Sequence, residues 1–208
     1  HGRCSLRLRF LHMSYPLWGG VRPCCEFWLV CRFHLSYQVC LMLGEATRKM
    51  GCLVRPAMEH LDVYCAALSM GWSPDNLRPD AAQEELAEIT KCPRTFLSRL
   101  EDLQGQGPPV ILPDGSSVPR LPSLKRWIWA NGFCGSIALR WQSDTDDLPP
   151  TCLGHVGYAV VPWRRREGLA TAALKEMLPI AREVGLQRVD LTVDPDNTAS
   201  IGVIKAAG

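Results

Sequence analysis

The sequence predicts a mixed α/β (α+β) domain, in which one central sheet is flanked by helices. From residue 50 on, segments with an apolar period of two alternate with segments of period 3.6, which are the signatures of strands and helices. Two strand-like segments are separated by Asn131-Gly132, the dipeptide favoured in type I′ hairpin turns. The predicted order is βαα, ββ, β, α, β, α, which fits a single layered domain without internal repeats.

The first predicted elements lie between residues 52 and 122. Residues 52–54 form a short strand, and residues 56–70 a helix that begins at a proline. Residues 80–103 form a second helix or a broken pair, because Pro93 interrupts the helical pattern. Residues 104–122 are rich in Gly, Pro and Ser, which predicts a loop.

A hairpin of two strands follows, over residues 125–130 and 133–142. Period-two alternation places two tryptophans of the first strand on one face and four apolar residues of the second strand on one face. These residues are Trp127 and Trp129, and Phe133, Ile137, Leu139 and Trp141. We interpret the tryptophans mainly as core residues, with lining of an acceptor pocket as the alternative.

The last third alternates strands and helices. Residues 154–161 predict a strand, residues 167–184 a helix that ends at Gly185, and residues 188–194 another strand. A final short helix opens at Asn197 or the threonine after it. Pro179 falls inside the longer helix, where a kink is expected.

Charge and cysteine content divide the chain unevenly. Residues 1–57 carry eight Lys/Arg and two Asp/Glu, whereas residues 58–208 carry fifteen and nineteen. We therefore interpret residues 1–49 as a basic, Cys-rich leader, poorly ordered or outside the true domain, and residues 50–208 as the folded domain. Because the chain starts at His1 and stops at Gly208 directly after a helix, we expect a C-terminally incomplete fragment.

Several partner classes are disfavoured. The acidic body argues against nucleic acid. The apolar stretch 27–43 is interrupted by Arg32 and His34 and is at the short edge of a membrane span. Cys31, His34 and Cys40 match no common metal-site spacing, so we expect no metal. The cysteines form no disulfide framework, which is typical of a reducing, cytoplasmic setting.

The turn between residues 161 and 168 has the chemistry of a phosphate cradle. A strand ends, three arginines follow, and Gly168 precedes a helix whose first backbone N–H groups are free. Glycine lets an anion approach the backbone closely, and arginine donates two hydrogen bonds to a phosphate. From composition alone, a solvated charged face is the other interpretation of this turn.

Two sequence blocks now resemble a known family. "GHVGYAVVPWRRREGLATAAL" and "VDLTVDPDNTASIGVIKAAG" are similar to the acetyl-CoA-binding core of the GNAT N-acetyltransferases. The family's pyrophosphate motif, Arg/Gln-x-x-Gly-x-Gly/Ala, corresponds to Arg165, Gly168 and Ala170. The second block corresponds to Asp194, Asp196, Asn197, Ala199 and Ser200. The resemblance is strongest over residues 154–208 and does not reach residues 1–49.

The resemblance implies an enzyme that transfers an acetyl group from acetyl-CoA to a primary amine by direct attack in a ternary complex. It implies main-chain contacts to the pantetheine arm from Ala159, Val160 and Val161. The pyrophosphate would bind Arg165, Arg166, Gly168, Leu169 and Ala170, and the thioester end would lie near Asn197 and Ser200. His155 is the candidate general base, with a hydrogen-bonded structural histidine as the alternative.

Three departures from the family pattern leave alternatives open. Glu167 puts a carboxylate beside the pyrophosphate, and Val203-Ile204 replaces the tyrosine that serves as general acid in many members. The family's last two strands are missing, so the strand at 188–194 would have an exposed edge. The alternative function is therefore a non-catalytic acyl-CoA-binding module or an inactive fragment. The acceptor stays open between a small amine, an antibiotic and a peptide N-terminus, and a homodimer is left open.

Overall fold

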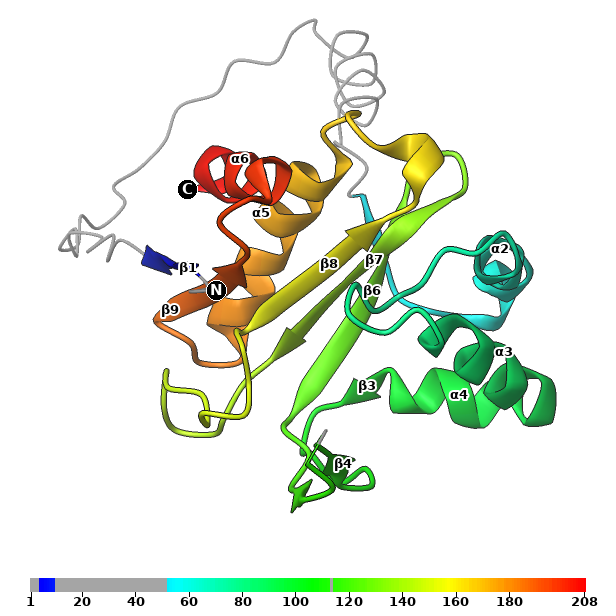
Figure 1. Cartoon of the computed structure of the whole chain (residues 1–208), viewed down its shortest axis with the longest axis horizontal. Coiled ribbons are helices and arrows are strands. Elements are labelled where there is room, and N and C mark those ends of the chain that lie inside the picture. Colours follow the sequence, from blue (N-terminus) through cyan, green and yellow to red (C-terminus); the bar gives the residue numbers. More distant parts are fainter. Residues whose placement is uncertain (1–3, 10–51, 113) are drawn as a thin grey trace, which may run out of the picture. The chain divides into compact units, whose positions relative to one another are not determined.

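The computed structural model of the protein describes residues 4–9, 52–112 and 114–208 (Figure 1), all within one structural unit. The predictions made for residues 27–43 and for the set Cys31, His34 and Cys40 lie outside the described residues. None of the helices in the described part of the chain is long and apolar enough to cross a membrane.

The main sheet confirms the predicted mixed fold. Its strand order is β2-β6-β7-β8, every neighbouring pair is antiparallel, and the short strand β3 (Glu101–Asp102) also pairs with β6. The four strands in this order are Leu53–Val54, Ser123–Trp129, Phe133–Arg140 and Val156–Val160. The β6–β7 connection is the predicted hairpin, with Asn131 and Gly132 both at positive φ (54° and 129°). The predicted loop before it holds a small hairpin of β4 (Val110–Ile111) and β5 (Ser117–Val118).

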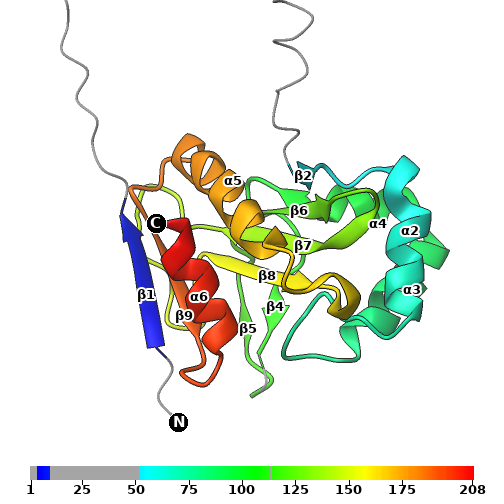
Figure 2. The same cartoon turned by 90° about the horizontal axis from the view of Figure 1, so that it is seen from above.

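Strand β9 (Arg188–Val193) has a partner that the sequence analysis misses. Strand β1 (Cys4–Arg9) pairs with it antiparallel over its whole length, with Leu6 opposite Leu191 (Figure 2). Leu8 is buried in the main core, and Arg7 forms an ion pair with Asp190 at 3.2 Å. The expectation of an exposed β9 edge is therefore wrong on this side, and residues 4–9 are part of the folded unit rather than a separate leader.

Helices lie on both faces of the sheet. Helices α5 (Leu169–Glu183) and α6 (Thr198–Ala207) lie on one side, and α2, α3 and α4 lie on the other (Figures 1 and 2). The latter three span Met58–Ser69, Ala81–Lys91 and Pro93–Arg99. The predicted break falls where Pro93 begins α4. Pro179 lies within α5, which continues past it, and Gly185 ends this helix at φ 97° as predicted.

Two apolar clusters fill the space on the two faces. The cluster under α5 contains Ile137, Leu139 and Trp141, which confirms their shared face. The cluster under α2 contains Trp127, which stacks on Tyr64 with ring centroids 4.5 Å apart. Phe133 also packs in this second cluster, so the predicted grouping of Phe133 with Ile137 is wrong. The reason is a register shift at the start of β7, where Gly135 has φ 148°.

Candidate active site

Strands β8 and β9 meet at one end and do not form a ladder beyond it. The backbone N–H of His155 donates to Asp190 O at 2.8 Å, and the Asp190 N–H donates to the imidazole Nδ1 of His155 at 3.0 Å. The imidazole thus takes the bond that a strand carbonyl would otherwise accept. Past this point β8 has no strand partner on its β9 side among the described residues, and we call this unpaired stretch between the two strands the β8–β9 gap.

The hydrogen-bond pattern of β8 decides which residues can offer main-chain groups to this gap. His155 O accepts from Arg140 N and Val161 N donates to Cys134 O, both at 2.9 Å, so the odd-numbered residues of the strand face β7. The expectation that Ala159 and Val161 offer main-chain groups to a cofactor is therefore wrong. By the same alternation the main-chain groups of Val160 and Tyr158 face the gap, where Asn76 Nδ2 donates to Tyr158 O at 3.0 Å.

The turn between β8 and α5, residues 161–168, has the geometry of an anion-binding site, which we call the anion seat. A 3₁₀ turn, η1 (Pro162–Arg164), is followed by Arg166 and Gly168, both at positive φ (67° and 74°). Gly168 directly precedes α5, so the first backbone N–H groups of this helix point into the turn. A Cβ added at Gly168 would meet no atom within 4 Å, so the space above the helix end is free for a ligand.

The three arginines of the turn have different surroundings. Arg164 binds Glu167 through two nitrogens, at 2.8 Å each, and its NH1 donates to Ala130 O in the β6–β7 turn at 3.0 Å. Arg164 thereby lowers the pKa of Glu167. The Nε of Arg165 donates to Val160 O at 3.3 Å, which holds this exposed side chain beside the free edge of β8. Arg166 is exposed, and no hydrogen bond or ion pair joins it to other described residues.

Helix α6 begins next to this gap. Asn197 is its N-cap and accepts a hydrogen bond from Ser200 N at 3.0 Å, as the sequence predicts. The Tyr158 hydroxyl reaches across from β8 and donates to Ser200 O at 3.4 Å. Burial raises the pKa of Tyr158, so the phenol keeps its proton at neutral pH.

The structure contradicts the prediction of His155 as general base. Its side chain is fully buried, with 0% exposure, and its Nδ1 already accepts the Asp190 N–H. Burial lowers the pKa of the imidazole, which keeps it neutral and suited to accepting that bond. His155 joins the two strands through Nδ1, and its Nε2 is buried without a hydrogen-bond partner among the described residues. Its full burial favours the structural interpretation of this histidine over the general base.

A cavity of about 950 Å³ opens on the face of the sheet opposite α5. Its floor is formed by small residues on neighbouring strands, Ser136, Ala138 and Gly157, which leave space that larger side chains would fill. Its far end includes Asn197 and Ser200, so the cavity borders the gap between β8 and β9. The sequence-predicted residues of α6 therefore lie where a group reaching through the gap would enter the cavity.

Charged groups on the cavity wall are mostly paired. Glu85 accepts from the hydroxyl of Tyr64 and pairs with Lys125 at 3.2 Å, and the side chains of this pair are only 16% and 20% exposed. Burial and the nearby Glu85 carboxylate raise the pKa of Tyr64. Arg78 pairs with Glu84, and Arg99 with Glu88. Glu85 is thus the most enclosed of these three paired carboxylates.

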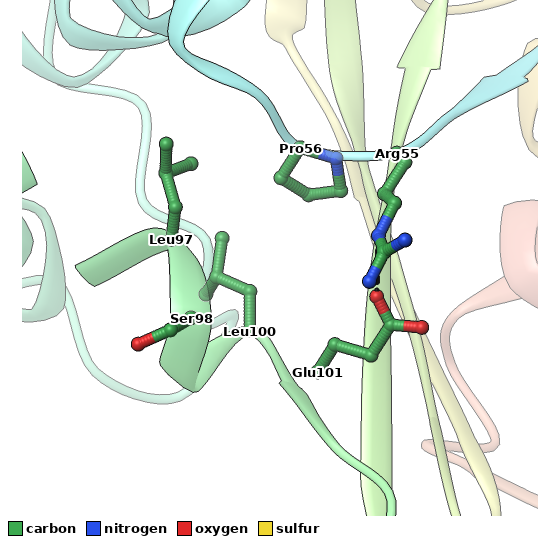
Figure 3. A pocket seen from close by; sticks show the side chains of 6 residues that line it. All are labelled: Arg55, Pro56, Leu97, Ser98, Leu100 and Glu101. Carbon is green, nitrogen blue, oxygen red and sulfur yellow. Dashed lines mark ion pairs between the residues drawn. The ribbon is translucent and has the colours of Figure 1, made fainter. Parts of the chain in front are cut away.

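A second hollow of about 420 Å³ lies beside α4 (Figure 3). Leu97 and Leu100 line one side of it, and Arg55 and Glu101 form an ion pair at 2.6 Å on the other. The ion pair and the hydroxyl of Ser98, which donates to Thr95 O at 2.9 Å, are the polar features of this hollow. It lies apart from Tyr158 and Val160, which line the β8–β9 gap.

Comparison with known proteins identifies the family. Residues 97–208 match the model of the Acetyltransferase (GNAT) family. The chain belongs to this family. The match runs from α4 to the end of α6 and includes the cavity floor, the turn at Gly168 and the Asn197 cap of this GNAT domain.

One solved structure and the curated sequences complete the comparison. The structure is that of "Microcin C7 self immunity acetyltransferase MccE in complex with Acetyl-CoA and AMP", with 10% sequence identity and a TM-score of 0.40. The alignment covers 75% of this chain and 76% of that chain. No curated protein sequence matches the chain.

Sequence reasoning misses three polar residues of the site. Tyr158 lies within the resemblance, but its spacing gives no sign that its hydroxyl reaches α6. The sequence pattern predicts Glu85 as a surface residue of a helix. Its ion pair with Lys125 of β6 shows that it faces the sheet. Arg140 is a charged residue at the end of an otherwise mainly apolar central strand. This change in polarity is the local sequence signal that indicates a residue facing the cavity.

Proposed function

We propose that this GNAT domain binds acetyl-CoA and transfers its acetyl group to a primary amine by direct attack in a ternary complex. The observation that supports the proposal is the edge of β8 that has no strand partner among the described residues, which leads from the anion seat at Gly168 to the cavity. The proposed catalytic unit comprises residues 52–208 together with β1, which pairs with β9.

Acetyl-CoA would lie along the turn before α5 and the edge of β8 that faces the β8–β9 gap. Its pyrophosphate would accept hydrogen bonds from the N–H groups of Gly168, Leu169 and Ala170, because these are free at the start of α5. Arg165 and Arg166 would add charge at the rim. The pantetheine arm would pair with the main chain of Val160 and Tyr158 as an added strand pairs with a sheet edge. It would displace the side chains of Arg165 and Asn76, which donate to the carbonyl oxygens of these two residues at 3.3 and 3.0 Å.

Bound acetyl-CoA supplies an activated acetyl thioester, and the protein must move two protons. A primary ammonium group has to lose one proton before its nitrogen attacks the thioester carbonyl, and a second as the C–N bond forms and the C–S bond breaks; one of the two is released to solvent. Glu85 is our candidate acceptor for the first proton, through cavity water, because it is the enclosed carboxylate of the cavity wall. The leaving thiolate has to gain one, and Tyr158 is our candidate donor, since its phenol is protonated and lies against α6. Tyr158 would thus supply the acid that Val203-Ile204 cannot.

The alternative is a GNAT-like module that binds acyl-CoA without turnover. Calorimetric titration with acetyl-CoA tests binding, and release of free CoA thiol in the presence of a panel of amines tests transfer. We expect micromolar binding and thiol release that depends on both protein and amine. Binding without amine-dependent release would leave the binding module as the function, and absence of binding would refute both.

A further inference from the structure

Arg140 differs from the other cations that line the cavity. Arg78, Arg99 and Lys125 each pair with a glutamate, and Arg120 donates to a backbone carbonyl. Among the residues that the structure describes, no hydrogen bond or ion pair satisfies the Arg140 guanidinium. This half-buried charge therefore has donors to spare for a ligand.

Its position is fixed by the sheet. Arg140 is the last residue of β7, and its backbone N–H donates to His155 O across the β7–β8 pair at 2.9 Å. The guanidinium extends over Gly157 on the neighbouring strand, where an added Cβ would lie 3.2 Å from its NH2 group. Glycine at this position thus leaves the room that the guanidinium occupies at the cavity floor.

A planar guanidinium with free donors binds an oxyanion in a two-pronged arrangement, which is stronger and more directional than a single ammonium contact. Burial of a charge is costly without such a partner. We propose that Arg140 anchors an oxyanion, a carboxylate or phosphate, of the acceptor, so that the substrate is an amine bearing such a group. This inference rests on the proposed function, because it names the acceptor class of that transfer.

The geometry favours a short spacing between the two groups of the acceptor. Gly157 directly precedes Tyr158, which is the second gap-facing residue, after Val160, that the cofactor arm would reach from the turn at Gly168. An anion held above Gly157 therefore leaves the amine close to the thioester end of the gap.

The test measures product binding, which does not require turnover. The intact protein with CoA is titrated with N-acetylglycine, N-acetylleucine and N-acetylphenylalanine, each beside its neutral amide, and with N-acetyl-O-phosphoethanolamine beside N-acetylethanolamine. Wild type should bind the anionic member of at least one pair about tenfold tighter or more. The carboxylate and phosphate arms decide which oxyanion is preferred.

Three variants sharpen the outcome. Arg140→Ala should abolish the anionic preference, Arg140→Lys should keep only part of it, and Arg99→Gln, a lining cation already paired with Glu88, should retain it. Acetyl-CoA affinity should be unchanged in all three and serves as the check of folding. No preference in wild type, or a preference that survives Arg140→Ala, overturns the inference. A preference that depends on Arg140 without any acetyl transfer would sustain the anchor and refute the proposed enzyme.

Discussion

Gly168 and Gly185 allow a matched test of the anion seat. They lie at the two ends of α5, both have positive φ (74° and 97°), and an added Cβ at either would meet no atom within 4 Å. Alanine at either site therefore adds backbone strain without a clash in the free protein. Only Gly168 lies where the pyrophosphate is proposed to bind, so Gly185→Ala is the control for strain.

The magnitudes separate the two effects. A left-handed alanine costs about 1–2 kcal/mol, which lowers the melting temperature by roughly 2–4 °C per kcal/mol for a domain of this size. We expect this loss of thermal stability in both variants. At Gly168 the new methyl group also keeps a phosphate oxygen from the backbone. Loss of one charge-assisted hydrogen bond, about 1.5–3 kcal/mol, weakens binding on the order of 10- to 150-fold.

Calorimetric titration of acetyl-CoA into the two variants and wild type measures the difference, and differential scanning calorimetry measures the strain. We expect Gly185→Ala to bind within about twofold of wild type, since a twofold change corresponds to less than 0.5 kcal/mol. Equal affinities in Gly168→Ala and Gly185→Ala would refute the placement of the pyrophosphate at α5. A larger loss of acetyl-CoA affinity in Gly185→Ala than in Gly168→Ala would refute the strain argument as well.

Four further predictions address the remaining parts of the site. Tyr158→Phe should lower kcat about 10- to 100-fold with unchanged acetyl-CoA affinity, measured by thiol release, because it removes the proposed proton donor alone. Glu85→Gln should lower kcat/KM by a similar factor, and an unchanged rate would rule out Glu85 as the proton acceptor. Leu8→Asp should destabilise the protein by about 2–4 kcal/mol in urea unfolding, because it buries a charge in the main core; wild-type stability would show that β1 does not pack there. Burial lowers the pKa of His155 below 6.5, so its contribution to the free energy of unfolding is present above pH 6.5 and is lost as the pH falls below that value. His155→Asn should reduce this loss of stability at acid pH in urea unfolding, because the amide oxygen of asparagine replaces Nδ1 as the acceptor for Asp190 N–H.

The elements with strong local signals could be predicted from the sequence. The hairpin turn at Asn131, the helix stop at Gly185 and the Asn197 cap each follow from a residue whose backbone or side chain suits one local geometry. The pairing of β1 with β9 could not be predicted, because it joins segments separated by about 180 residues and nothing in local periodicity names a partner. The unpaired edge of β8 could not be predicted either, because it depends on where β9 diverges from β8 in space.

The candidate site was predictable where backbone geometry defines it and unpredictable where side chains must be oriented. Gly168 could be predicted to precede a helix, because glycine adopts the positive φ that the N-cap of α5 has here. His155 was a sound candidate by chemistry, yet burial beside Asp190 gives it a structural role. Tyr158 and Arg140 became visible only once neighbouring strands fixed which way each side chain points.

Glu167 shows how one charged turn can serve both structure and binding. A carboxylate next to a pyrophosphate site should repel the ligand, and the sequence gives no reason for it. In the structure Glu167 binds Arg164, whose remaining nitrogen holds the β6–β7 turn through Ala130 O. The charge of Glu167 is thereby neutralised by an ion pair within the turn, and Arg164 joins the turn to the sheet. Arg165 and Arg166 have no carboxylate partner among the described residues, so their charges remain available for the proposed pyrophosphate.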